Sequence, residues 1–245
     1  MSDARHILRI SGSDAKSFLQ GLVTNDVDKT RDGLVYAALL TPQGKYLADF
    51  FLLADGDDIL LDVDASLAEA LKMRLTMYKL RADVVIADAD IHVHQGTSEC
   101  PADGYMDPRA TALGWRAYRD TAQDGDTTDW TALYVASEVP RTGIELSADS
   151  YILEMGFERL NGVDFRKGCY VGQEVTARMK HKTELRKGLA QVTVTGAAQA
   201  GDEITANGKP VGTLHSRAGD TALAYLRFDR ATGEMQAGEA TLTRA

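Results

Sequence analysis

Short apolar runs separated by turn residues dominate the first third of the chain. Leu34–Val63 divides into three strands at two turn signals, Thr41–Gly44 and Asp55–Asp58. His6–Ile10 has the same character and predicts an earlier strand, and Val84–His94 predicts one or two later strands. Because the connections inside Leu34–Val63 are short, we expect its three strands to form an antiparallel meander.

Two stretches repeat apolar residues at helical spacing. Ser66 with Glu69 three residues later forms a capping-box sequence, which predicts a helix from Ser66 to about Lys79. An earlier helix should begin after a cap at Ser13 or Asp14 and run to about residue 22. The apolar positions of the longer helix are Leu67, Leu71, Leu75 and Tyr78.

The order of strands, then a helix, then strands predicts an α+β fold rather than a doubly wound parallel sheet. Gln95–Arg109 is rich in Gly, Ser, Asp and Pro and predicts a loop, and a weak helical pattern follows between residues 127 and 138. No glycine-rich phosphate-binding sequence of Rossmann or Walker type follows any of the predicted strands.

The pattern changes after Leu185 to short β-like runs. Turn signals at Asn207–Gly208 and Ala218–Asp220 separate these runs, which is typical of a small closed barrel or sandwich. We therefore predict a domain boundary near Arg186, with one domain over residues 1–185 and a C-terminal β-barrel domain over residues 186–245.

The composition is that of an ordinary soluble globular protein, with 44% hydrophobic and 26% charged residues. The N-terminal segment lacks the apolar stretch of a secretory signal, so we expect a cytoplasmic protein. The formal net charge of −9 argues against binding to membranes and against direct binding to nucleic acid. Two cysteines, Cys100 and Cys169, cannot form a disulfide framework, and neither could hold an iron–sulfur cluster without ligands from other chains.

One segment runs against this acidic balance. Arg178–Lys187 contains five Lys or Arg residues and one Glu. Cations at a helix C-terminus are favoured in any case, so a solvated helix end is one interpretation of the segment. A site for an anionic ligand is the other, and an RNA-binding module is a third hypothesis that rests on this segment alone.

Cys169 has the sequence surroundings of a reactive thiol. Arg166 and Lys167 precede it, Gly168 frees the backbone beside it, and a helix is expected from about Glu174 to residue 180. Cations and a helix N-terminus both stabilise the thiolate, whereas a free cysteine with a pKa near 8.5 is only about 3 per cent ionised at pH 7. The alternative is that Cys169 is a small buried residue, as free cysteines often are.

Asp49 is a charged residue inside an apolar strand sequence. It must have a partner or face a cavity, unless it occupies a solvent-facing alternate position. His92 and His94 share one face of a predicted strand, but no third ligand is suggested nearby, so a structural role is favoured and no metal site is predicted.

The run Phe165–Glu174, FRKGCYVGQE, followed by Ala177 and Arg178, closely resembles the signature of the YgfZ-type folate-binding proteins. These proteins are relatives of the glycine-cleavage T-protein aminomethyltransferases and include a mitochondrial iron–sulfur assembly factor. The resemblance covers most of the chain. Its other segments are Ser11–Asp14, Phe18–Leu19, Thr24–Val27, Asp107–Arg109, Leu113–Arg116, Gly208–Gly212 and Ala222–Leu226.

The resemblance implies a three-lobed ring with antiparallel sheets and a small C-terminal barrel, the glycine-cleavage T-protein (GcvT-like) fold. Residues 1–185 would form a folate-binding region of two interleaved α+β lobes, with tetrahydrofolate, in polyglutamated form, as the cofactor. Asp49 lines up with the aspartate that the aminomethyltransferases set against the folate, and Arg178, Lys180 and Arg186 would meet the glutamate tail. Further folate-binding candidates are Asn25, Asp26, Tyr36, Arg109, Lys167, Tyr170, Gln173 and Glu174.

The resemblance leads to two hypotheses. The aminomethyltransferases lack the Lys-Gly-Cys-Tyr sequence, which favours a folate-binding accessory protein for iron–sulfur cluster synthesis or repair, with cluster-dependent tRNA-modifying enzymes among its clients. Cys169 is then the functional thiol, and iron–sulfur assembly or client proteins are its partners. The alternative is an enzyme, a tetrahydrofolate-dependent aminomethyltransferase in which Asp49 orients the folate amine. The sequence also departs from the family at Lys182–Glu184, where a glycine usually follows the basic residues.

Overall fold

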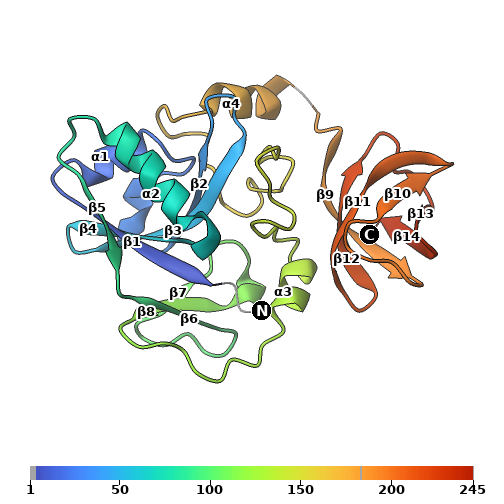
Figure 1. The fold of residues 1–245 in the computed structure, drawn as a ribbon, viewed down its shortest axis with the longest axis horizontal. Coiled ribbons are helices and arrows are strands. Elements are labelled where there is room, and N and C mark those ends of the chain that lie inside the picture. Colours follow the sequence, from blue (N-terminus) through green and yellow to red (C-terminus); the bar gives the residue numbers. More distant parts are fainter. Residues whose placement is uncertain (1–3, 183, 245) are drawn as a thin grey trace. The chain divides into compact units, whose positions relative to one another are not determined.

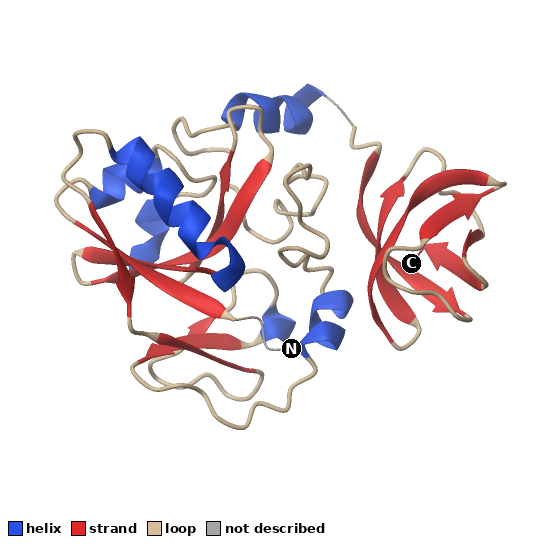
Figure 2. Ribbon diagram, in the orientation of Figure 1, coloured by secondary structure: helices blue, strands red, loops and turns tan. Residues whose placement is uncertain are grey.

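The computed structural model describes residues 4–182 and 184–244, which form two compact units. One unit comprises Met1–Thr128 and Glu158–Val175, and the other comprises Asp129–Phe157 and Thr176–Ala245. Helices and antiparallel sheets are both present, which confirms the predicted α+β class (Figures 1 and 2). Thr183, in the segment that departs from the family pattern, lies outside the described residues.

The first unit is built on a five-stranded sheet in the order β2-β3-β4-β1-β5, in which all neighbouring strands are antiparallel. The predicted meander is therefore confirmed as β2, β3 and β4, and the earlier strand adds to its far side between β4 and β5. The strands are β1 (Arg5–Ser11), β2 (Val35–Leu40), β3 (Tyr46–Asp55), β4 (Asp58–Asp64) and β5 (Val85–Ala89).

Two α-helices cover one face of this sheet, α1 (Ala15–Gln20) and α2 (Ala65–Lys79). Both were predicted. Asp14, one of the two predicted caps, is the N-cap residue of α1, whereas the predicted capping box of α2 at Ser66 is wrong. The carboxylate of Asp64, rather than the Ser66 hydroxyl, accepts from the N–H of Ser66 at the start of α2. Asp14 makes no capping bond to α1, because its carboxylate accepts from the N–H of Asp83 at 2.9 Å. At α2 a different acceptor, Asp64, takes the place of the Ser66 hydroxyl, and at α1 a donor from outside the helix, the N–H of Asp83, occupies the Asp14 carboxylate.

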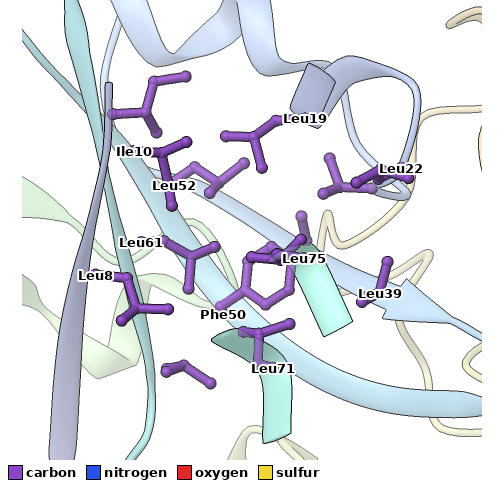
Figure 3. Close-up of a cluster of buried hydrophobic side chains, with 14 of the residues drawn as sticks. Leu8, Ile10, Leu19, Leu22, Leu39, Phe50, Leu52, Leu61, Leu71 and Leu75 are labelled. Atoms are coloured by element: carbon purple, nitrogen blue, oxygen red, sulfur yellow. The ribbon is translucent and has the colours of Figure 1, made fainter. Parts of the chain in front are cut away.

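The main hydrophobic core lies between these helices and the sheet, and Figure 3 shows its centre. Alternate residues of each strand enter it because side chains of a strand point to opposite faces. Phe50, Leu52 and Leu61 come from the strands, and Leu71 and Leu75 come from α2. No helix within the described ranges is long and apolar enough to cross a membrane.

The opposite face of the sheet is covered by a second, three-stranded sheet in the order β6-β8-β7. The segment 95–109, predicted as a loop, contains the end of one of these strands and the whole of another, so that prediction is wrong in part. The strands are β6 (His92–Gly96), β7 (Tyr105–Met106) and β8 (Trp115–Arg119), and two short 3₁₀ helices complete the unit, η1 (Val27–Arg31) and η2 (Thr111–Leu113).

Charged side chains lie buried where β8 meets the five-stranded sheet. Asp62, 1% exposed, accepts from Arg5 Nε at 2.7 Å, from Arg116 Nη1 at 3.3 Å and from the Tyr118 hydroxyl at 3.0 Å. The guanidinium carbons of Arg5 and Arg116 lie 5.8 and 4.3 Å from the centre of the Phe51 ring. Burial of charge is costly unless every charge is paired, so this cluster holds the two sheets in a single arrangement.

The second unit contains a closed barrel of six antiparallel strands in the order β10-β11-β12-β9-β14-β13. Its own apolar core fills the barrel. The helix predicted between residues 127 and 138 is α3, and α4 starts in the first unit and ends in the second. The elements are α3 (Trp130–Ala136), α4 (Gln173–Lys182), β9 (Lys187–Thr195), β10 (Glu203–Ala206), β11 (Lys209–Ala218), β12 (Thr221–Arg227), β13 (Met235–Ala237) and β14 (Ala240–Arg244).

Replacing Asp62 by Ala should destabilise the protein by about 3–5 kcal/mol, because two largely buried guanidinium groups would lose their shared carboxylate. Urea unfolding measures this free energy. Asp90→Ala is the matched control, because that carboxylate is fully exposed and its loss should change stability by less than about 0.5 kcal/mol. A loss below about 1 kcal/mol for Asp62→Ala would contradict the structural role of the cluster.

Candidate functional site

Two buried side chains anchor the segment that contains Cys169. Lys167 is 9% exposed, and its ammonium donates to the carbonyls of Gln20 at 2.7 Å and Val23 at 2.6 Å, just where α1 ends. Gln20 is the last residue of α1 and its carbonyl has no partner within the helix, so the lysine caps α1, and through Val23 it also holds the segment that follows. Tyr170 is also buried, with its ring centre 5.2 Å from the ammonium. Burial of the ammonium lowers the pKa of Lys167 to about 8.

Cys169 is exposed, between these two anchors. The interpretation of Cys169 as a buried residue is therefore wrong. Among the described residues, none makes a hydrogen bond with its thiol. The charge of Lys167 is engaged with backbone carbonyls, while Arg166 is largely exposed and lies 3.7 Å from the carboxylate of Asp164. The thiol is thus presented to solvent on a fixed backbone.

The glycine that shapes this segment is Gly172 rather than Gly168. Gly172 has a φ of +83°, and a Cβ there would lie 2.6 Å from the carbonyl oxygen of Thr41. Gly44, in the turn between β2 and β3, has a φ of +76°, and a Cβ there would lie 2.8 Å from the Cβ of Val175. The two glycines therefore let the hairpin turn and the cysteine segment pack backbone against backbone.

The helix expected after Cys169 is confirmed as α4, which begins at Gln173. The Gln173 side-chain amide donates to the carbonyl of Gly168 at 3.4 Å, which bridges the cysteine and the helix. Glu174 is exposed in the first helical turn. Three residues separate Cys169 from the first residue of α4, so the thiol precedes the helix N-terminus instead of belonging to it.

Asp49 lies on β3, 7% exposed, and has partners. Its two carboxylate oxygens accept from the hydroxyls of Tyr36 at 2.9 Å and Tyr46 at 2.6 Å. Burial and the neighbouring carboxylate both raise the pKa of Tyr36 well above its ordinary value, so its phenol stays a donor. A solvent-facing Asp49 is therefore excluded, and a partnered one is confirmed.

Tyr46 was missed by the sequence reasoning, and a β-bulge explains why. Leu39 pairs with Ala48 and Leu40 pairs with Tyr46, which leaves Leu47 as an extra residue in β3. In a regular strand, residues three apart point to opposite faces, but one inserted residue returns Tyr46 to the face of Asp49. A bulge of this kind has no signature in the apolar pattern.

Two other folate-binding candidates, Asn25 and Asp26, make hydrogen bonds within the protein. The Asn25 amide donates to the carbonyls of Tyr36 and Asn161 at 2.8 and 2.7 Å, and its oxygen accepts from the N–H of Asp26. Asp26 caps η1 by accepting from the N–H of Asp28 at 3.0 Å. Both side chains therefore fix the local backbone. Asn25 also holds the backbone at Asn161, which has a φ of +55° that the sequence pattern does not predict.

Arg109 is buried and paired. Its guanidinium donates to both carboxylate oxygens of Asp107, at 3.0 and 2.8 Å, and lies 4.8 Å from the Phe51 ring centre and 5.5 Å from that of Tyr36. Burial opposes the charged form of Asp107, but Arg109 and Arg116 outweigh it and lower the pKa of Asp107. This pair connects the Asp107–Arg109 segment to the Tyr36 side of the sheet.

The cationic candidates lie in the second unit. Arg178 and Lys180 are exposed on α4, and Arg186 is exposed just before β9. Exposed cations agree with both a solvated helix end and an anion site. An open groove of about 610 Å³ is lined by Glu154, Met179, Glu184, Leu185, Arg186, Lys187 and Arg227.

The two histidines considered as metal ligands serve different roles. His94 is buried, and its Nε2 lies 2.6 Å from the carbonyl of Thr121, whereas His92 is exposed. Within residues 4–182 and 184–244, no three His, Cys, Asp or Glu side chains gather closely enough to hold a metal ion.

Fold comparison finds the same fold in an aminomethyltransferase. The glycine cleavage system aminomethyltransferase T from Bartonella henselae superimposes with a TM-score of 0.75 over 98% of this chain and 82% of that protein. Sequence identity is 11%, so the match shows the fold alone. It confirms the fold class predicted from the sequence.

Sequence comparison finds proteins with higher sequence identity to this chain than the aminomethyltransferase has. Residues 186–245 match the family model "CAF17, C-terminal beta-barrel domain". The protein named iron-sulfur cluster assembly factor IBA57, mitochondrial, from Mus musculus is 29% identical over 95% of this chain and 78% of that protein. The homologue of this factor from Mycosarcoma maydis is 36% identical over 75% of this chain. The chain spans about half, 54%, of the Mycosarcoma protein. The chain is thus similar in sequence to proteins named iron–sulfur cluster assembly factor IBA57 and, over its C-terminal barrel, to the CAF17 family model, and it shares the fold of an aminomethyltransferase.

Gly172→Ala should destabilise the protein by about 1–3 kcal/mol, because alanine is strained at this φ and its methyl group would collide with the Thr41 carbonyl. Gly168→Ala is the matched control in the same segment. Its φ is not positive and the added methyl group would meet nothing within 4 Å, so we expect a change below about 0.5 kcal/mol in urea unfolding. Equal effects of the two substitutions would contradict the assignment of the turn to Gly172.

Proposed function

We propose that this chain is an accessory factor for iron–sulfur cluster assembly in other proteins, with Cys169 as its functional thiol. The observation that carries the proposal is the sequence similarity, over 95% of the chain, to a protein named as an iron–sulfur cluster assembly factor. The exposure of Cys169 on an anchored segment supports it, because a thiol must be accessible to meet a partner.

Cys169 would act together with ligands from another protein. Iron–sulfur clusters are held by about four thiolates, so one cysteine supplies only a fraction of a cluster site. The cluster is cargo in this proposal, and Cys169 meets either a cluster or a partner thiol during transfer or repair. The fixed backbone around the thiol, set by Lys167, Tyr170 and Gly172, would reduce the entropy lost when the partner binds.

Tetrahydrofolate, in polyglutamated form, is the ligand that we propose, following the YgfZ-type resemblance. The Asn25 amide donates to two carbonyls and the Arg109 guanidinium pairs with Asp107 inside the protein, so these residues would support the pocket and not contact the ligand. Asp49 remains the candidate for the pterin, and the exposed cations, such as Arg178 and Arg186, suit glutamate carboxylates. When bound, tetrahydrofolate would supply a carrier for one-carbon units.

Cluster-dependent enzymes, including those that modify tRNA, are the proposed clients, and the cytoplasm is the proposed location. The relatives with known names are mitochondrial, so an equivalent role in a different compartment is part of the proposal.

Aminomethyl transfer is the alternative function, and the fold match is the observation that favours it. It requires Asp49 to meet the folate amine, although both carboxylate oxygens of Asp49 already accept from tyrosine hydroxyls. A glycine-cleavage assay with the lipoyl carrier protein distinguishes the two functions.

Cys169→Ser should abolish most of the support that this protein gives to cluster enzymes, because a hydroxyl does not ionise at neutral pH and is a poor ligand for iron. The assay is the activity of a cluster-dependent enzyme in cells that lack this protein and express each variant. Cys100→Ser is the control, since this half-buried thiol donates to the carbonyl of its neighbour Pro101. Full activity of a stably folded Cys169→Ser variant would refute the role of the thiol.

Calorimetric titration should detect tetrahydrofolate binding with a Kd of about micromolar order, tightening as glutamates are added. Asp49→Asn should weaken binding of every form. Arg178→Ala should weaken the polyglutamated form most, because its guanidinium would meet the tail. Lys209→Ala, an exposed cation on the barrel, serves as the control for net charge. Absence of binding would remove folate from the proposal and leave the role of Cys169 to be judged by its own assay.

A further inference from the structure

The outer side of α2 carries apolar residues where solvent-facing polar residues are expected. Met73, Met77 and Leu80 are 60%, 65% and 88% exposed. At about 100° per residue, Met73 and Met77 project from the side of α2 opposite the residues that enter the core, and Leu80 is the C-cap residue that follows the helix. Those core residues are Ala68, Leu71 and Leu75. Single exposed apolar residues are ordinary, but Met73 and Met77 one helical turn apart, followed by Leu80 at the C-cap, mark an interaction surface.

The strained backbone conformation of Leu80 is a second, independent observation that points to a functional role for this surface. Leu80 ends α2 with a φ of +49° and a ψ of −107°, in a region that only glycine adopts without strain. A glycine would relieve this strain and remove the exposed side chain at the same time. Strained residues that persist in exposed positions are candidates for a functional role.

A shallow apolar groove adjoins this line of residues. It has a volume of about 70 Å³, far below the roughly 300–1,000 Å³ of small-molecule pockets, and suits one protruding side chain. Ala70 lies on its edge and is one turn from both Met73 and Arg74, so it joins the groove to the exposed line. The groove is lined by Leu39, Leu47, Ala48, Leu67, Ala70, Leu71 and Arg74.

The charges around this surface are positive although the chain as a whole carries −9. Arg74 and Arg81 are exposed, and neither makes an ion pair with any residue that the structure describes. Lys72 is already paired with Asp88, and Glu69 is an exposed carboxylate in the first half of α2. Two guanidinium groups beside apolar residues are therefore left available for carboxylates from outside.

We propose that this α2 surface, formed by Met73, Met77, Leu80 and the adjoining groove, docks an acidic amphipathic helix of a partner protein. Met73 and Met77 are four residues apart on α2, which matches the spacing of anchors on a second helix laid alongside. Methionine side chains adapt to the partner, and Arg74 and Arg81 pair with acidic residues that flank the partner's apolar line.

Charge and shape favour this occupant over two others. A second copy of the chain would meet this surface with the same surface. The arginines of one copy, Arg74 and Arg81, would then lie close to those of the other, and like charges repel. An anionic membrane would attract the two arginines, but the groove gives no advantage on a lipid surface, and Tyr78, the aromatic residue of α2, packs against the hydrophobic core and is not an exposed anchor.

The test uses the full chain with methyl-labelled methionine and a synthetic helical peptide of about 15 residues, with leucines on one face and glutamates beside them. The acidic peptide should shift the NMR signals of the Met73 and Met77 methyl groups and leave that of Met106, an exposed methionine on β7, unchanged. A peptide with lysines in place of the glutamates should bind at least about tenfold more weakly.

Variants and competing probes decide between the occupants. Met73→Gln with Met77→Gln should weaken the acidic peptide by about tenfold or more, whereas Met106→Gln should not change its affinity. Arg74→Glu with Arg81→Glu should reverse the preference to the lysine peptide. The proposal is overturned if neither peptide binds, if both bind equally, if Met73 and Met77 respond to anionic vesicles but not to the peptide, or if their signals change with protein concentration alone.

Discussion

The charged cluster around Phe51 is the constraint on which the first unit depends. Arg5, Arg109 and Arg116 approach this ring to between 4.3 and 5.8 Å, and the carboxylates of Asp62 and Asp107 pair them. Charges so well buried are tolerated in one geometry and penalised in others. The cluster therefore fixes the three-stranded sheet on the five-stranded one, which an apolar interface of the same size would do less specifically.

The position of the thiol follows from this arrangement step by step. Arg109 packs on Tyr36, and Tyr36 holds Asp49, so the β2–β3 hairpin is fixed in place. Its turn at Gly44 then meets the backbone at Gly172, three residues beyond Cys169. Lys167 joins the same segment to the end of α1 from the other side. Residues predicted to bind ligand thus form a support that places an exposed cysteine.

The sequence predicts the parts that depend on local pattern and misses those that depend on long-range contacts. The meander and α2 follow from alternation and helical spacing, and the anomaly of Asp49 in an apolar strand is visible without a structure. Its second partner, Tyr46, is not, because one bulge changes the face of a side chain. The engagement of Lys167 depends on carbonyls nearly 150 residues away in the chain, at positions 20 and 23, which no local pattern encodes.

A single exposed thiol is a weak basis for binding a protein, and this gives the α2 surface its significance. A thiol that binds its partner only briefly needs frequent encounters with that partner. A second contact on the same partner raises the effective concentration of the partner at the thiol. Cys169 and α2 belong to the same compact unit, whose sheets are locked by buried charge, so a helix docked on α2 would stay in a defined relation to the thiol. The rigid sheets of the first unit and the adaptable side chains of Met73 and Met77 would then together select a partner that Cys169 alone could not recognise.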